Sequence, residues 1–158
     1  MSASLLSRLE TAETSCDRIA LLDELRATTT ESPGRIAPFM HLIQSAFTDL
    51  VRPVRSLAYQ CALNYISSNP FMSVHFMSAY FAALLHKSAD ISLHALSFLP
   101  EFIIASRCIS EDLLSAAAIA VNRWPSPESM ADFSRAVIAC ADFRCTDLEE
   151  NGNSQTMK

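Results

Sequence analysis

The sequence predicts an all-α fold, a solenoid of about four stacked helical hairpins. Segments 54–66 and 91–103 repeat one apolar pattern 37 residues apart. A period in this range is typical of hairpins that bury their apolar faces against neighbouring hairpins. Half of the 158 residues are hydrophobic, which suffices for a continuous core. Two glycines are too few for a sandwich, a barrel or a Gly-rich phosphate loop.

Apolar residues at helical spacing, together with capping residues and prolines, divide the chain into eight expected helices. Consecutive helices are paired into hairpins. The expected helices cover residues 4–14, 16–29, 35–51, 53–67, 70–87, 90–103, 110–124 and 128–143.

The boundaries in the first half of the chain follow from one cap and several prolines. Ser15 is expected to cap the second helix, and the Thr-rich segment 28–34, which ends in Pro-Gly, predicts a loop. Pro38 fits only in the first turn of the third helix, where its missing N–H costs nothing. Pro53 opens the fourth helix.

The boundaries in the second half follow the same rules. Asn69 and the proline after it start the fifth helix, and Asp90 caps the sixth. Pro100 lies deep inside the sixth pattern and predicts a kink or a split near Phe98. Ser110 caps the seventh helix, and a rigid Pro-Ser-Pro turn precedes the eighth.

The domain organisation follows from where the apolar periodicity ends. Residues 1–143 are expected to form one helical-repeat domain. Residues 144–158 are polar and without periodicity, which predicts a disordered tail.

Charge and cysteine usage limit the functional classes. A net charge of −5, with scattered basic residues, argues against direct sequence-specific binding of nucleic acid. An odd number of cysteines without CxxC spacing indicates reduced thiols in a nuclear or cytosolic protein. No apolar window is long enough for a membrane span, and the N-terminus lacks the pattern of a secretory signal.

No motif in the sequence predicts catalysis, a cofactor or a metal site. His75 and His86 would share a helix face but lie three turns apart, too far for one ion. No GxSxG motif or catalytic-cysteine context is present, so we do not expect an enzyme.

Six residues are candidates for contacts with another protein. The fifth expected helix is apolar around most of its circumference, and is therefore either central in the stack or an interface. Trp124, at a helix end, is either an interface anchor or a plug that closes the last hairpin. The close pair Arg52 and Arg55 is either a solvated helix shoulder or an anion contact. The candidates are Phe76, Tyr80, Phe81, Trp124, Arg52 and Arg55.

The segment ALSFLPEFI, residues 95–103, carries the pattern Ala-Leu-x-x-Leu-Pro-Glu-aromatic. With the proline-led turn at Pro127 and the run at 54–59, it resembles the C-terminal end of the Integrator complex subunit 1 family. The resemblance spans roughly residues 53–143. It implies a HEAT/ARM-like solenoid that is a non-catalytic scaffold within a nuclear complex that cleaves small nuclear RNA and other RNA polymerase II transcripts.

The resemblance therefore predicts a scaffold that binds other Integrator subunits, through a groove between second helices or through the exposed part of the fifth helix. The endonuclease of that complex is a separate subunit. The alternative from the residues alone is a stand-alone adaptor in cytosolic trafficking or signalling, with Arg52 and Arg55 as its ligand site. Under that alternative the protein would be cytoplasmic rather than nuclear.

Overall fold

The computed structural model describes the backbone of residues 5, 7, 8, 13–107 and 110–156, and side chains as far as Asp142. The expected first helix, residues 4–14, lies mostly outside the described residues. Everything that follows concerns the described part of the chain.

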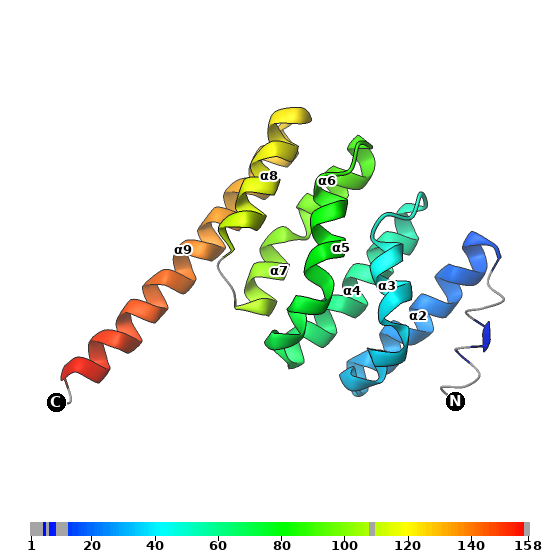
Figure 1. Cartoon of the computed structure of the whole chain (residues 1–158), viewed down its shortest axis with the longest axis horizontal. Coiled ribbons are helices and arrows are strands. Elements are labelled where there is room, and N and C mark those ends of the chain that lie inside the picture. Colours follow the sequence, from blue (N-terminus) through cyan, green and yellow to red (C-terminus); the bar gives the residue numbers. More distant parts are fainter. Residues whose placement is uncertain (1–4, 6, 9–12, 108–109, 157–158) are drawn as a thin grey trace.

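The described helices are stacked in two layers that follow one another from α2 to α9, and the predicted all-α solenoid is confirmed (Figure 1). In one layer α2 packs on α4, α4 on α7, and both α6 and α7 on α9. In the other layer α3 packs on α5, and α5 on α8. The first layer contains α2 (Ser15–Glu31), α4 (Arg52–Ser68), α6 (Ala89–Ser97), α7 (Leu99–Ser106) and α9 (Pro127–Thr156). The second layer contains η1 (Pro33–Phe39), α3 (Met40–Ala46), η2 (Pro70–Ser73), α5 (Val74–Leu84) and α8 (Glu111–Arg123).

Two helices expected to be continuous begin instead with a 3₁₀ segment. The third expected helix is divided into η1 and α3, and Pro38 lies inside η1 rather than in the first turn of an α-helix. Similarly, η2 precedes α5 and starts at Pro70. A proline removes an N–H donor and crowds the preceding turn, so short 3₁₀ segments are common where helices start.

The predicted break at Pro100 is confirmed. Helices α6 and α7 are inclined by 42° to one another, with Phe98 between them. Pro100 is in the first turn of α7, where no backbone hydrogen bond is lost. The chain still turns continuously, because the Phe98 N–H donates to the Ala95 carbonyl and the Phe102 N–H to that of Phe98.

The last helix is longer than expected. Helix α9 does not end near Phe143 but continues to Thr156, so the backbone of the segment expected to be a disordered tail is helical as far as that residue. The division of the chain into a repeat domain, residues 1–143, and a separate tail, residues 144–158, stays a prediction.

An aromatic cluster at the centre of the stack joins the two layers. Tyr59 of α4 is stacked between Phe47, at a centroid distance of 4.4 Å, and Phe98, at 4.7 Å. Tyr80 of α5 is stacked on Phe102 of α7 at 4.2 Å, and its hydroxyl donates to the Ala95 carbonyl at 2.6 Å. Offset aromatic pairs of this kind add stability beyond the area that they bury.

Within the described residues, no single helix has the length and apolar character to cross a membrane. The bent pair α6–α7 has both when taken together, but most of its residues are buried against neighbouring helices.

Candidate protein-interaction site

The fifth-helix candidates lie mainly in the core. Phe76 and Tyr80 on α5 have no exposed surface, and Phe81 is half-buried. The sequence left two interpretations open for this helix, a central position in the stack or an interface. Phe76 and Tyr80 occupy the central position. A partner that contacts the folded chain could reach Phe81 but not those two rings.

The exposed apolar part of the fifth helical segment lies at its start. Phe71 of η2 is 88% exposed and Val74 of α5 is 68% exposed. The 3₁₀ turn has three residues per turn, so it rotates Phe71 away from the buried stripe that follows. The sequence pattern alone did not separate these residues from their buried neighbours, because all of them fit one apolar helix.

Arg55 lies in the core and uses each of its nitrogens. Its side chain has no exposed surface. Its Nη2 donates to Asp90 Oδ2 at 2.6 Å, and its Nη1 donates to the Asp49 carbonyl at 2.8 Å. Its Nε donates to His94 Nδ1 at 2.9 Å. The guanidinium therefore links α4 to the loop before it and to α6.

Arg52 shares the Asp90 carboxylate with Arg55. Arg52 Nη1 lies 3.1 Å from Asp90 Oδ1, and both side chains are mostly exposed. The hydrogen bond from Arg55, followed by the charges of both arginines, holds the pKa of Asp90 below its usual value. Arg55 is therefore closed to an external phosphate or carboxylate, whereas Arg52 is exposed and uses one nitrogen, Nη1, on Asp90.

A related contact occurs one repeat earlier. Arg18 of α2 is 37 residues before Arg55, and its Nε lies 3.3 Å from Asp49 Oδ2. The corresponding position in α6 is Ser92, whose hydroxyl donates to the Leu84 carbonyl at 2.6 Å. The 37-residue period of the sequence therefore places polar side chains, as well as apolar ones, at equivalent positions.

His94 is a buried neutral acceptor. Because Nδ1 accepts the Arg55 hydrogen bond, the proton of the ring is on Nε2, which lies 3.2 Å from the Ser56 hydroxyl. Burial first, and then the charges of Arg52 and Arg55, lowers the pKa of His94 to about 4. These contacts hold α4 against α6.

Trp124 follows the last residue of α8 and is half-buried. Its carbonyl accepts a hydrogen bond from the Ser129 hydroxyl at 3.2 Å, which fastens the turn into α9. Its indole N–H is buried and makes no hydrogen bond within the described residues. The position suits the closing of the last hairpin, and a contact with a partner stays a prediction.

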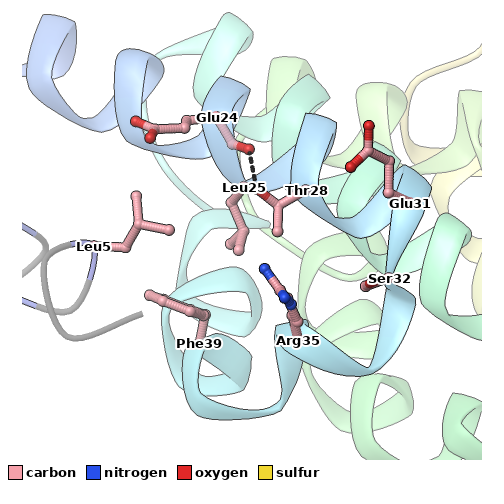
Figure 2. Close-up of a pocket in the computed structure, with 8 residues that line it drawn as sticks. All are labelled: Leu5, Glu24, Leu25, Thr28, Glu31, Ser32, Arg35 and Phe39. Carbon is pink, nitrogen blue, oxygen red and sulfur yellow. Dashed lines mark hydrogen bonds between the residues drawn. The ribbon is translucent and has the colours of Figure 1, made fainter. Parts of the chain in front are cut away.

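A pocket of about 310 Å³ lies between α2 and η1 (Figure 2). Leu25 and the Arg35 guanidinium point into this space, whereas the carboxyl groups of Glu24 and Glu31 point away from it. Leu5 and Phe39 flank it. Among the described residues no group of three or more His, Cys, Asp or Glu side chains is placed to hold a metal ion.

A second depression, also of about 310 Å³, lies between α7 and α9, which are both second helices of their hairpins. Such a groove is one of the two partner sites that the sequence predicts. Apolar side chains from both helices form part of its lining, and charged side chains form the rest. Its lining residues are Pro100, Glu101, Ile104, Arg135, Ile138, Ala139 and Asp142.

Comparison with known families gives a match over most of the helical stack. Residues 6–106 match the family described as Integrator complex subunit 1, R4 domain. The matched region includes α2 to α7 and is more than half of the chain. It extends further toward the N-terminus than the expected span of residues 53–143, and it stops before α8. A search of curated proteins gives no match.

Proposed function

This chain belongs to the family of Integrator complex subunit 1, and from this membership we propose that it is a non-catalytic scaffold module of the nuclear Integrator complex. It holds other subunits of that complex in place. Through them it contributes to the 3′-end processing of small nuclear RNA and to the regulation of transcription by RNA polymerase II. The family match over residues 6–106 is the observation that carries this proposal.

The architecture supports a scaffold role. A two-layer solenoid presents extended surfaces formed by successive helices, and such surfaces are suited to binding other chains. Apolar side chains with more than half of their surface exposed, such as Phe71 and Ile138, occur at the start of η2–α5 and along α9. Where exposed apolar side chains form a contiguous patch, they mark a candidate interaction site.

The alternative, a cytosolic adaptor that binds an anionic ligand through Arg52 and Arg55, has less support. Arg55 has no exposed surface and its donors are used within the chain. Only Arg52 reaches solvent, and it is paired with Asp90.

Affinity purification of the tagged chain from nuclear extract, followed by mass spectrometry, tests the proposed function. We expect several Integrator subunits to be enriched over a tag-only control. A matched control is Leu96→Asp, which places a charge at a fully buried position and should abolish enrichment by unfolding the chain. Recovery of the folded wild-type chain without any Integrator subunit would overturn the proposal.

A further inference from the structure

We propose that the groove between α7 and α9 binds an amphipathic helix of another Integrator subunit, one whose apolar residues are flanked by lysine or arginine. This inference rests on the proposed scaffold function and names the site and the chemistry of the partner.

The apolar part of the groove is larger than the packing of the two helices requires. Ile104 of α7 is 58% exposed and Ile138 of α9 is 59% exposed, and both line the groove. The two helices pack through other residues. The fully buried positions of this region are Leu99, Phe102, Ile103 and Ala136.

Covering both isoleucines would stabilise a complex. Removing apolar surface from water is favourable, and these two residues still expose more than half of their surface. Pro100 and Ala139 extend the apolar lining beside them. A partner therefore gains most if it places two or three apolar side chains between α7 and α9.

The charged side chains of the groove determine which residues are favourable beside the apolar residues of the partner. The described lining carries two carboxylates, Glu101 and Asp142, and one guanidinium, Arg135. Arg135 lies close enough to act on Glu101 and also forms an ion pair with Asp132, a third carboxylate beside the groove. Carboxylates therefore outnumber cations at the described rim. Opposite charges across an interface increase the association rate and exclude wrong partners, so lysine or arginine beside the apolar residues is favoured.

The shape of the site favours a helix as the occupant. The depression runs between two neighbouring helices, and an amphipathic helix commonly binds in such a groove through residues spaced three or four apart. A second copy of this chain is a poorer occupant, because the chain has a net charge of −5 and the rim is acidic. The same acidic rim disfavours nucleic acid.

Photo-crosslinking in the full chain tests the occupant. Benzoylphenylalanine at position 104 or 138 should crosslink to an Integrator subunit, and sequencing of the crosslinked peptide should give an amphipathic helical segment with basic flanks. The matched control places the probe at Ile119, an exposed residue of α8 outside the groove, and should not crosslink to that segment. Crosslinks only to a second copy of this chain, or only to an acidic or non-helical segment, would overturn the proposal.

A double substitution separates this proposal from the scaffold function. Because Ile104 and Ile138 are exposed, Ile104→Asp with Ile138→Asp should leave the circular dichroism spectrum and Tm unchanged. Recovery of the crosslinked subunit should fall at least about tenfold, which corresponds to about 1.4 kcal/mol. If the wild-type chain recovers Integrator subunits and the double variant recovers them equally, the groove proposal fails and the scaffold function stands. If the wild-type chain recovers none, the scaffold function fails first.

Discussion

The guanidinium of Arg55 lies in the core, where a charged group is stable only when its donors are paired. Its partners come from two segments that are distant in the sequence, the Asp49 loop and α6. A purely apolar residue of similar length would pack in the same space, but it would leave these acceptors without a donor. The side chain therefore contributes to the register between α4 and α6 as well as to their contact area.

Replacement of Arg55 by methionine should destabilise the chain by about 3 kcal/mol, since it removes a buried charged donor and leaves the Asp49 carbonyl and His94 Nδ1 unpaired. The matched control is Arg52→Met, which removes the exposed partner of the same Asp90 and should cost less than about 0.5 kcal/mol. Urea unfolding followed by circular dichroism measures both. Equal midpoints for the two variants would contradict this account of Arg55.

The pKa of His94 predicts a dependence of stability on pH. Its pKa is about 4 in the folded chain and 6.5 ordinarily, so between these values the unfolded chain binds a proton that the folded chain does not. The contribution of neutral His94 to the free energy of unfolding is therefore fully present above pH 6.5, and it is lost as the pH is lowered toward 4. One pKa unit corresponds to about 1.4 kcal/mol, so we expect a loss of roughly 3 kcal/mol over this window.

The His94→Asn variant isolates this effect, because asparagine offers an acceptor near the position of Nδ1 and does not titrate. Urea midpoints of the wild type measured from pH 7 to pH 4.5 should decline more steeply than those of the variant. Asp90 does not interfere in this range, since its pKa lies below its ordinary value of 3.8. Parallel declines would show that other groups dominate.

At the scale of elements, the η2–α5 segment has two different apolar surfaces. One includes Phe76 and Tyr80, whose rings are buried by contacts inside the chain. The other includes Phe71 and Val74, which are mostly exposed. Substitutions that test for an interface on this segment must therefore be made at its start.

Phe71→Asp and Phe76→Asp form a matched pair on this segment. Phe76→Asp should unfold the chain or destabilise it by more than about 4 kcal/mol, because it buries an unpaired carboxylate and leaves a cavity. Phe71→Asp should change stability by less than about 0.5 kcal/mol. Thermal unfolding measures both, and a large loss of Tm for Phe71→Asp would show that its ring is needed inside the fold.

The elements also show how far the sequence could predict the structure. Prolines were the most informative residues, since Pro53 opens α4 and Pro100 separates α6 from α7 as predicted. Their effect is local and steric, so no tertiary information is needed. The prediction for Pro38 was wrong, since this residue lies inside η1 and not in the first turn of an α-helix. A 3₁₀ turn accommodates proline, but it has no apolar pattern of its own by which the sequence could reveal it.

The candidate site could be predicted less well, because exposure depends on neighbours that the sequence does not specify. Ile104 and Ile138 fit the apolar pattern of their helices as well as the buried residues beside them do. Similarly, Arg55 appeared to be part of a surface pair, since its acceptors at Asp90 and His94 lie more than 30 residues away. The packing of α4 against α6 and α7 decides the case of Arg55, and the packing of α7 on α9 decides those of Ile104 and Ile138.

At the scale of the whole molecule, the stack is continuous across the end of the family match. The matched residues 6–106 end with α7, yet α7 packs on α9 and α5 packs on α8. The groove proposed for a partner therefore has one side inside the matched region and one side outside it. This arrangement makes the last hairpin a structural support for the matched domain.

Removal of residues 108–158 should affect the remaining helices unequally. In a solenoid each hairpin contacts only its neighbours, so the loss of α8 and α9 exposes the faces of α5, α6 and α7 that they covered. Amide hydrogen exchange in α6 and α7 should become faster by at least about tenfold, whereas exchange in α2 should change by less than about twofold.

Exchange of the full chain under the same conditions is the control, and mass spectrometry of peptic fragments resolves the helices separately. The difference between α2 and α7 is expected because α2 packs on α4 and has no main contact with the last hairpin. A uniform increase across all helices would mean that the chain unfolds as one cooperative unit, in which the central aromatic cluster couples every hairpin. That outcome would contradict the nearest-neighbour description of this fold, whereas a gradient from α7 to α2 would support it.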